Sequence, residues 1–303
     1  MTYPLGWQSW SPPHGGFSFL ARDYCPLPIT SHPRSTAFSK AITYWCSWYA
    51  LGPVISPSSI LHQAHLIKKY HLNIEYIIID DGWRFGSSTI DLIQELHLLK
   101  LKVGLWYAPF TKHKNLPLYE TLEHLVKNYH PDLLKLDFLY KPYFNSGLTD
   151  DRIPHQTLLD LFTYLRHNYP SLYTIACGCP FAPALGRVHA IRYSKDTTFP
   201  PPTPRWIRQL IYYSRVKLLS RKHSLIPPSF TSTPDPDVRM FSLDNATTAN
   251  FWDTIHSECL GLGDNIDSLT TSQLDKARIW LQKNPSSPSS SPRLTRPNTS
   301  HYS

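Results

Sequence analysis

The chain has 303 residues, of which 41% are hydrophobic and 17% charged, so it is long enough for one barrel-sized domain or two smaller ones. The formal charge of +8 is a modest excess, and the scattered lysines and arginines argue against a nucleic-acid-binding surface. No apolar run reaches membrane-spanning length, and the first residues lack the basic and apolar regions of a signal peptide. We therefore expect a soluble, cytoplasmic protein.

The cysteines favour a reducing compartment. There are five of them, an odd number, and no two have the Cys-x-x-Cys spacing. No combination of cysteine and histidine fits a zinc site, and the histidines at positions 62, 65 and 71 are explained by the polar face of a helix. Free thiols are the simplest interpretation, and no metal site is expected.

Residues 1–40 are rich in proline, glycine and serine and contain the aromatic cluster Gly6–Ser11, which predicts an irregular lead-in that packs on a larger domain. From residue 41 onward, strand and helix patterns alternate. Apolar strand patterns occur at 41–45, 75–80, 102–107, 133–139, 172–177 and 189–193. Helical patterns with one apolar face occur at 56–70, 89–100, 118–128, 154–169 and 204–219.

The alternation weakens after residue 220. The expected elements there are a strand at 225–230, a helix at 246–260, a short strand at 260–265 and a helix at 272–282. About eight strand–helix units predict parallel strands with helical crossovers. A minimal (β/α)8 TIM barrel over residues 41–284 is favoured over a doubly wound sheet, because no glycine-rich phosphate turn follows a strand. The Ser/Pro-rich tail at 285–303 is predicted to be disordered.

The expected strand Leu133–Leu139 carries two charges inside an apolar run. Lys135 and Asp137 are two residues apart, so on a strand they point to the same side. They also lie near the carboxyl end of the strand, where barrel enzymes carry their chemistry. An unpaired buried charge is unfavourable. Either a structural ion pair or an active site would explain these residues, and the stretch alone does not decide between the two.

Polar and aromatic residues collect at the carboxyl ends of the expected strands. They are Asp80, Asp81 and Trp83 after the second strand, Trp106 at the third, Asp137 at the fourth, and Asp196 after the sixth. One acid in such a place could cap a helix. Acids after three alternate strands of a barrel predict a shared site.

Two carboxyl groups on opposite sides of a scissile bond are the groups that cleave a glycoside. One must be ionised to attack the anomeric carbon, and we expect Lys135 to favour the ionised form of Asp137. Asp196 lies on a looser Ser-Lys-Asp-Thr-Thr loop, where a change of protonation state is easier to arrange. The aspartates after the second strand suit hydrogen bonds to sugar hydroxyls, and the nearby tryptophans offer flat faces to a pyranose.

Six motifs occur in an order typical of one enzyme family. They are Tyr44–Gly52, Asp80–Trp83, Gly104–Phe110, Lys135–Tyr140, Cys177–Pro180, and Arg192 with Asp196. Together they resemble the melibiase-type α-galactosidases of glycoside hydrolase family thirty-six. The cluster Gly6–Ser11 and the segment Asp235–Asp237 resemble further parts of that family, so the resemblance covers roughly residues 5–270.

The resemblance implies a retaining α-galactosidase that releases terminal α-linked galactose from oligosaccharides by double displacement. It implies that Asp137 is the nucleophile and Asp196 the general acid/base. The substrate-binding residues that go with it are Asp80, Asp81, Trp83, Lys135, Cys177, Gly178, Arg192, Trp45 and Trp106. The family uses no metal and no organic cofactor, and neither a nucleic acid nor a membrane is an expected partner.

The chain departs from the family pattern in two respects. The N-terminal β-sandwich and the C-terminal β-domain of the family are not recognisable, which leaves the oligomeric state open. The segment Thr197–Pro202, after the expected acid/base, is rich in proline. Two other functions stay open: galactosyl transfer, as in raffinose-synthase-like proteins, and sugar binding without catalysis. The presence of Lys135, Asp137 and Asp196 argues against the second of these.

Overall fold

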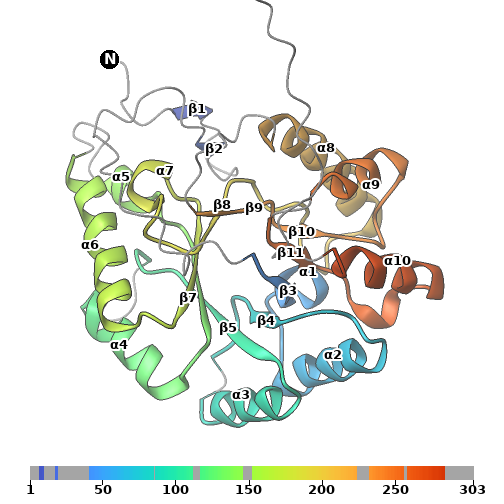
Figure 1. The fold of residues 1–303 in the computed structure, drawn as a ribbon, viewed down its shortest axis with the longest axis horizontal. Helices are drawn as coiled ribbons and strands as arrows, with labels where there is room; N and C mark the ends of the chain where they lie inside the picture. Colours follow the sequence, from blue (N-terminus) through green and yellow to red (C-terminus); the bar gives the residue numbers. More distant parts are fainter. Residues whose placement is uncertain are drawn as a thin grey trace, which may run out of the picture.

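A computed structural model of the chain shows a curled parallel sheet with helices around its outside (Figure 1). It describes residues 41–84, 86–111, 117–145, 152–223, 232–255 and 258–283, together with the short antiparallel strands β1 (Trp7–Ser9) and β2 (Ser18–Phe19). The rest of the lead-in, the expected strand at 225–230 and the tail at 285–303 lie outside the described residues.

Nine described strands form the main sheet in the order β10-β11-β3-β4-β5-β6-β7-β8-β9, and all neighbours are parallel. Their bounds are β3 Thr43–Cys46, β4 Tyr76–Ile79, β5 Lys102–Tyr107, β6 Leu133–Leu136, β7 Tyr173–Cys177, β8 Ala190–Arg192, β9 Thr233–Asp235, β10 Val238–Arg239 and β11 Leu260–Leu262. Only Pro236 and Asp237 separate the two edge strands along the chain. This is the α/β architecture of a TIM-barrel-related domain.

The helices connect successive strands and cover the outer face of the sheet (Figure 1). Their bounds are α1 Ser47–Leu51, α2 Pro57–Lys69, α3 Ser88–Leu98, α4 Leu118–Tyr129, α5 Lys141–Asn145, α6 Arg152–Asn168, α7 Phe181–Ala184, α8 Arg205–His223, α9 Ala246–Asp253, the 3₁₀ helix η2 Ile266–Ser268 and α10 Thr271–Leu281. Helix α2 illustrates how the sequence specifies them. The Ser56 hydroxyl accepts the Ser59 N–H at 3.2 Å, and Ile60 and Ile67 bury one face.

The core fills both sides of the sheet. Every residue of β3, β4, β6 and β7 is buried, as expected for parallel strands covered on both faces. Isoleucines and leucines make up most of β4 and β6. Each such side chain contributes about 1.5–3 kcal/mol of transfer free energy when fully buried. The sheet is therefore a rigid platform for the residues that follow its strands.

Two sequence expectations need correction, and two strands were not anticipated. Strand β6 ends at Leu136 rather than Leu139, because Phe138 adopts φ 54°, a left-handed conformation that interrupts the strand. The short strands β9 and β10 were not expected. Helix α9 ends at Asp253 instead of running to residue 260. The short helices α1, α5 and α7 were not anticipated.

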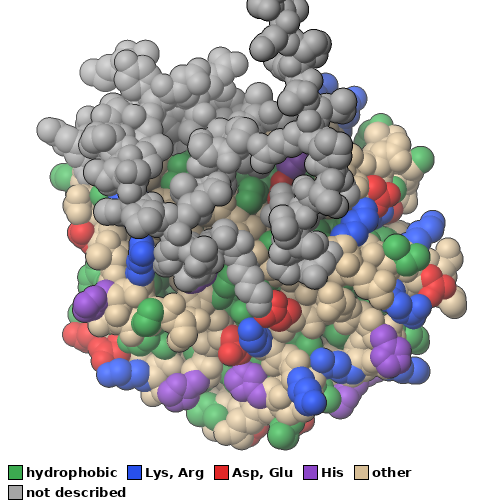
Figure 2. All heavy atoms as spheres, in the orientation of Figure 1, with side chains coloured by type: hydrophobic (Ala, Val, Ile, Leu, Met, Phe, Trp, Pro, Cys, Tyr) green, Lys and Arg blue, Asp and Glu red, His purple; other side chains and the backbone are tan. Residues whose placement is uncertain are grey.

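The surface charge and the cysteines agree with the general character expected from the sequence. Charged side chains of both signs are interspersed over the described part of the face in Figure 2. Among the described residues, no helix is both long and apolar enough to cross a membrane. Cys46, Cys177, Cys179 and Cys259 are buried free thiols, as the sequence predicted.

Candidate active site

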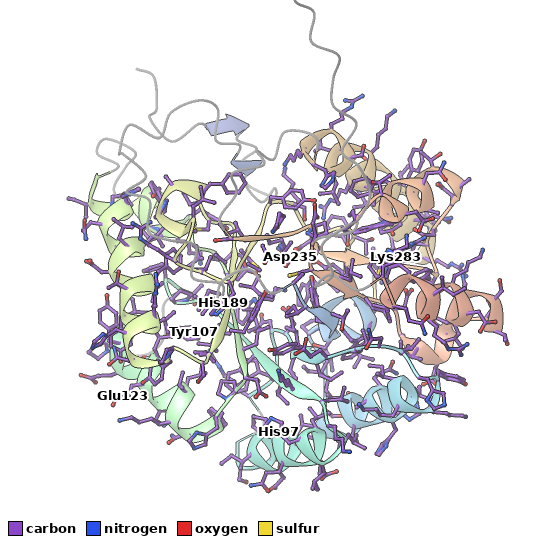
Figure 3. All side chains as sticks on the ribbon, in the orientation of Figure 1. His97, Tyr107, Glu123, His189, Asp235 and Lys283 are labelled. Carbon is purple, nitrogen blue, oxygen red and sulfur yellow. The ribbon has the colours of Figure 1, made fainter. Side chains whose placement is uncertain are left out.

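Several polar residues meet at one end of the sheet because of the strand register. Cys177, Arg192 and Asp235 pair directly with one another across β7, β8 and β9. Paired residues of parallel strands point to the same side of a sheet. Asp137 follows Leu136, which pairs with Ala176, so Asp137 is level with Cys177. Figure 3 labels Asp235, which comes from β9 in this row.

Lys135 forms a buried ion pair with Asp80. The Lys135 Nζ lies 2.5 Å from Asp80 Oδ2, and both side chains are buried. Burial opposes the charged form of Lys135, but the effect of Asp80, with smaller effects of Cys46 and Cys177, raises the pKa of Lys135 well above its usual value. The sequence had suggested Asp137 as the partner. The lysine instead reaches past β5, which separates β4 from β6 in the sheet, to the end of β4.

The Asp137 carboxylate is held through both of its oxygens. The Trp106 indole N–H donates to Oδ2 at 3.1 Å, and the Phe138 backbone N–H donates to Oδ1 at 2.7 Å. Phe138, the next residue, has a left-handed backbone conformation, and its N–H points to the Asp137 carboxylate. The side chain is half-buried, so its position is fixed while part of it faces solvent.

Asp196 is anchored more firmly than its loop had suggested. Arg192 donates to Asp196 Oδ1 at 2.8 Å, and the Tyr49 hydroxyl lies 3.2 Å from the same oxygen. Arg215 also bonds the Asp196 backbone carbonyl. Burial acts to raise the pKa of Asp196, but the Arg192 guanidinium is the main opposing group and the net pKa is lowered. The Asp196 side chain is nevertheless 41% exposed, so it is accessible from solvent.

A second carboxylate, Asp237, lies behind Asp196. Its side chain is only 2% exposed. The Tyr49 hydroxyl is 2.5 Å from Asp237 Oδ2, and the Thr197 N–H donates to the same oxygen at 3.0 Å. Burial, together with the nearby Asp196 charge, raises the pKa of Asp237 to about 6 against the opposing charge of Arg192. The sequence assigned Asp237 no role beyond its Asp-Pro-Asp resemblance, and no sequence signal singled out Tyr49.

The expected aromatic platform is mostly buried. Trp45 is fully buried and donates its indole N–H to the Asp264 carbonyl at 2.9 Å, so it packs in the core. Trp83 donates to the Trp106 carbonyl at 2.7 Å, and both indoles are buried. These rings were expected to face a sugar. In the structure they support the residues around them.

The remaining expected residues differ in their exposure. Cys177 is fully buried, and burial raises its thiol pKa, so the thiol is neutral. The charges of Arg192, Asp137 and Lys135 all act on this thiol, which places it among them. Gly178 is half-buried, and Asp81 is exposed at the tight turn after β4, where it accepts the Gly82 N–H at 3.0 Å.

Solved structures supply the comparison with known proteins, since no protein-family model and no curated protein matches the sequence. An α-galactosidase from Thermus thermophilus, solved with p-nitrophenyl α-D-galactopyranoside, superposes with a TM-score of 0.60 at 18% identity and covers 80% of this chain and 62% of that one. An α-galactosidase from Lactobacillus brevis gives a TM-score of 0.55 at 16% identity, with 82% and 40% covered. A GH36 α-galactosidase from Geobacillus stearothermophilus gives 0.52 at 14% identity, with 80% and 41% covered.

The chain shares its fold with α-galactosidases. At these identities the likeness concerns the fold alone. The chain spans between 40% and 62% of the length of these three proteins. The Thermus thermophilus protein has also been solved in complex with stachyose.

Proposed function

We propose that this protein is a retaining glycoside hydrolase that releases terminal α-linked galactose. The observation that carries the proposal is the placement of Asp137 and Asp196. Both carboxylates are partly exposed, and each is fixed by hydrogen bonds: Asp137 by Trp106 and the Phe138 N–H, and Asp196 by Arg192. Double displacement at a glycoside requires two positioned carboxyl groups that a substrate can reach.

We assign each carboxylate one role, and the contacts of Asp137 support its assignment as the nucleophile. Asp137, fixed by Trp106 and Phe138, attacks the anomeric carbon as that carbon's bond to the leaving oxygen breaks. Asp196 supplies a proton to the leaving oxygen. In the second step, Asp196 takes a proton from water, and the oxygen of that water replaces Asp137 on the anomeric carbon. The sugar leaves with its original anomeric configuration.

The proposal that the sugar is galactose rests on the proteins that share this fold. The relatives are α-galactosidases, and one is solved with p-nitrophenyl α-D-galactopyranoside and with stachyose. Among the described residues, the buried Nε of Arg192 has no hydrogen-bond partner, so this guanidinium retains a free donor at this end of the sheet. The charge of Lys135, which pairs with Asp80, acts on Arg192, so these polar groups belong to one cluster suited to a ligand of many hydroxyls.

We also propose that the sheet closes into a (β/α)8 barrel whose seventh strand is formed jointly by β9 and β10. Strand β9 pairs with β8 and strand β10 pairs with β11. The Cys259 N–H, one residue before β11, donates to the Pro234 carbonyl of β9 at 3.1 Å. This bond supports closure, because it joins the two sides of the interruption.

Purified protein incubated with a panel of aryl glycosides tests the function. We expect hydrolysis of the α-galactoside, and its abolition in Asp137→Asn. In Asp196→Ala, a substrate with a good leaving group should keep its first step, and added azide should rescue turnover. Asp91→Asn, at an exposed position on α3, is the matched control and should retain activity. Full activity of Asp137→Asn would refute the nucleophile assignment, and transfer to a concentrated sugar acceptor in place of hydrolysis would favour the transferase.

A further inference from the structure

We propose that Asp237 stores the proton that Asp196 delivers to the leaving oxygen, and that Tyr49 relays this proton from Asp237 to Asp196. The inference rests on the proposed glycosidase function and adds two positioning residues to it. Tyr49 bridges the two carboxylates, one accessible and one buried. Asp237, with a side chain 2% exposed, is too deeply buried to contact a substrate and acts through Asp196.

The geometry of the Tyr49 hydroxyl requires a proton on one of its neighbours. The hydroxyl oxygen lies 2.5 Å from Asp237 Oδ2 and 3.2 Å from Asp196 Oδ1. A hydroxyl has one hydrogen and donates one hydrogen bond, but it also accepts. Both contacts are favourable only when Tyr49 donates to one carboxylate and accepts from the other. The accepting contact requires that the second carboxyl group carry a proton.

Two arrangements of the same proton satisfy this requirement. In the first, protonated Asp237 donates to Tyr49, and Tyr49 donates to ionised Asp196. In the second, the proton leaves Asp237 for the Tyr49 oxygen, while the original Tyr49 hydrogen moves to Asp196. One proton passes from Asp237 to Asp196, and Tyr49 is a neutral phenol before and after. Asp196 in the second arrangement is ready to protonate the leaving oxygen.

The charges around Asp196 and Asp237 explain why these two carboxyl groups share a proton. Arg192 contacts both carboxyl groups, at 2.8 Å for Asp196 and 3.5 Å for Asp237, so one guanidinium faces two acids. The other charged or titratable groups that act on Asp237 are Lys135 from β6, Asp235 from β9, and Tyr44 and Cys46 from β3. Of these, Lys135 already pairs with Asp80. Arg215 from α8 also acts on Asp196 and bonds its backbone carbonyl. The carboxyl groups of Asp196, Asp235 and Asp237 therefore face two guanidinium groups, those of Arg192 and Arg215, and the excess of one negative charge favours binding of one proton.

The pKa values agree with this assignment of the proton. Arg192 lowers the pKa of Asp196, which by itself would leave a general acid unprotonated at neutral pH. Burial raises the pKa of Asp237 to about 6. A proton bound by the pair therefore rests on Asp237 rather than on Asp196, and the pair titrates as a unit.

Tyr49→Phe and Asp237→Asn test the relay. The readout is the pH dependence of kcat/KM for aryl α-galactosides with good and with poor leaving groups. With the poor leaving group, which needs an acid, Tyr49→Phe should lose roughly tenfold to a hundredfold in rate. With the good leaving group it should stay near wild type. Asp237→Asn should move the alkaline limb to lower pH, because removal of the nearby negative charge favours ionised Asp196.

Tyr212→Phe is the matched control. It removes another buried tyrosine hydroxyl, on α8, that donates to Asp244 at 2.8 Å and contacts neither member of the pair. It should leave the pH profile and the leaving-group dependence unchanged. Thermal unfolding of each variant shows whether it is folded.

A solvent isotope effect on the wild-type protein also tests the proton relay. The rate of the first step in mixtures of light and heavy water should depend on isotope fraction along a curve, because two protons move together. A straight line, or a wild-type profile in both Tyr49→Phe and Asp237→Asn, would overturn the relay while leaving the glycosidase function standing. Absence of any turnover by the wild type would refute the function, and the relay with it.

Discussion

Truncation of Lys135 to alanine should destabilise the protein severely. Lys135 Nζ lies 2.5 Å from Asp80 Oδ2, and the side-chain exposures are 7% and 5%. Lys135→Ala leaves the Asp80 carboxylate buried, with the Cys46 thiol at 3.4 Å as its other close contact at that oxygen. Loss of one partner from a buried ion pair costs about 3–5 kcal/mol. Folded domains are stable by only about 5–15 kcal/mol, so a large part of the stability should disappear.

Lys102→Ala is the matched control for this experiment. Lys102 is on the neighbouring strand β5 and pairs with Glu75 at 2.9 Å, but its side chain is 47% exposed. Solvent screening limits such a pair to about 0–1 kcal/mol. The two substitutions remove the same side chain from adjacent strands and differ chiefly in burial.

Urea unfolding followed by tryptophan fluorescence measures both changes, since the chain has nine tryptophans. The double variant Asp80→Asn/Lys135→Met should be more stable than the sum of its single changes predicts, because neither buried charge remains. If Lys135→Ala shifts the unfolding midpoint no further than Lys102→Ala, with equal slopes, the argument that this buried pair stabilises the fold is wrong.

Two further predictions concern the backbone and pH. Gly82→Ala should destabilise the protein more than Gly86→Ala, although both glycines have positive φ. A Cβ on Gly82 would meet the Pro53 carbonyl oxygen at 2.3 Å, whereas a Cβ on Gly86 meets nothing within 4 Å. In urea unfolding, Gly86→Ala should therefore cost only about 1–2 kcal/mol. The hydrogen bond that His223 Nδ1 donates to Glu258 Oε1, at 2.7 Å, raises the pKa of His223. Protonated His223 therefore stabilises the folded state fully below its unfolded pKa of about 6.5, and this contribution is lost as pH rises through the higher folded pKa. Thermal unfolding between pH 6 and about 9 should show a smaller decline in His223→Gln than in the wild type or in His65→Gln, and equal declines would contradict the assignment.

Local patterns predicted the regular elements well. The Ser56-Pro57 start and the apolar positions of α2 depend on neighbours within a few residues, and β5 was placed at its observed bounds. The end of β6 was not predicted, because the left-handed conformation of Phe138 is imposed by its surroundings. Strands β9 and β10 escaped detection because they are three and two residues long and are defined by the strands beside them.

The sequence suggested a set of candidate site residues, but it did not predict the contacts between them. Strand-end position brought Asp137, Arg192 and Asp196 into consideration together. The partner of Lys135 could not be read from the sequence, because spacing along one strand says nothing about a residue two strands away. The burial of the Trp45 ring was equally invisible, since an aromatic residue at a strand end suits both a core and a pocket.

The bonds that assemble the candidate site join the two ends of the described chain, and this has a consequence for how the protein folds. Tyr44 and Asp235 are 191 residues apart in sequence, Tyr49 and Asp237 are 188 apart, and Trp45 and the Asp264 carbonyl are 219 apart. Such distant partners meet late, because the closure of a long loop must precede any gain from the contact. During synthesis, Tyr49, which follows β3, can contact Asp196 and Asp237 only after most of the domain has emerged from the ribosome. We expect activity to appear with the slowest phase of refolding, after most helical structure has formed.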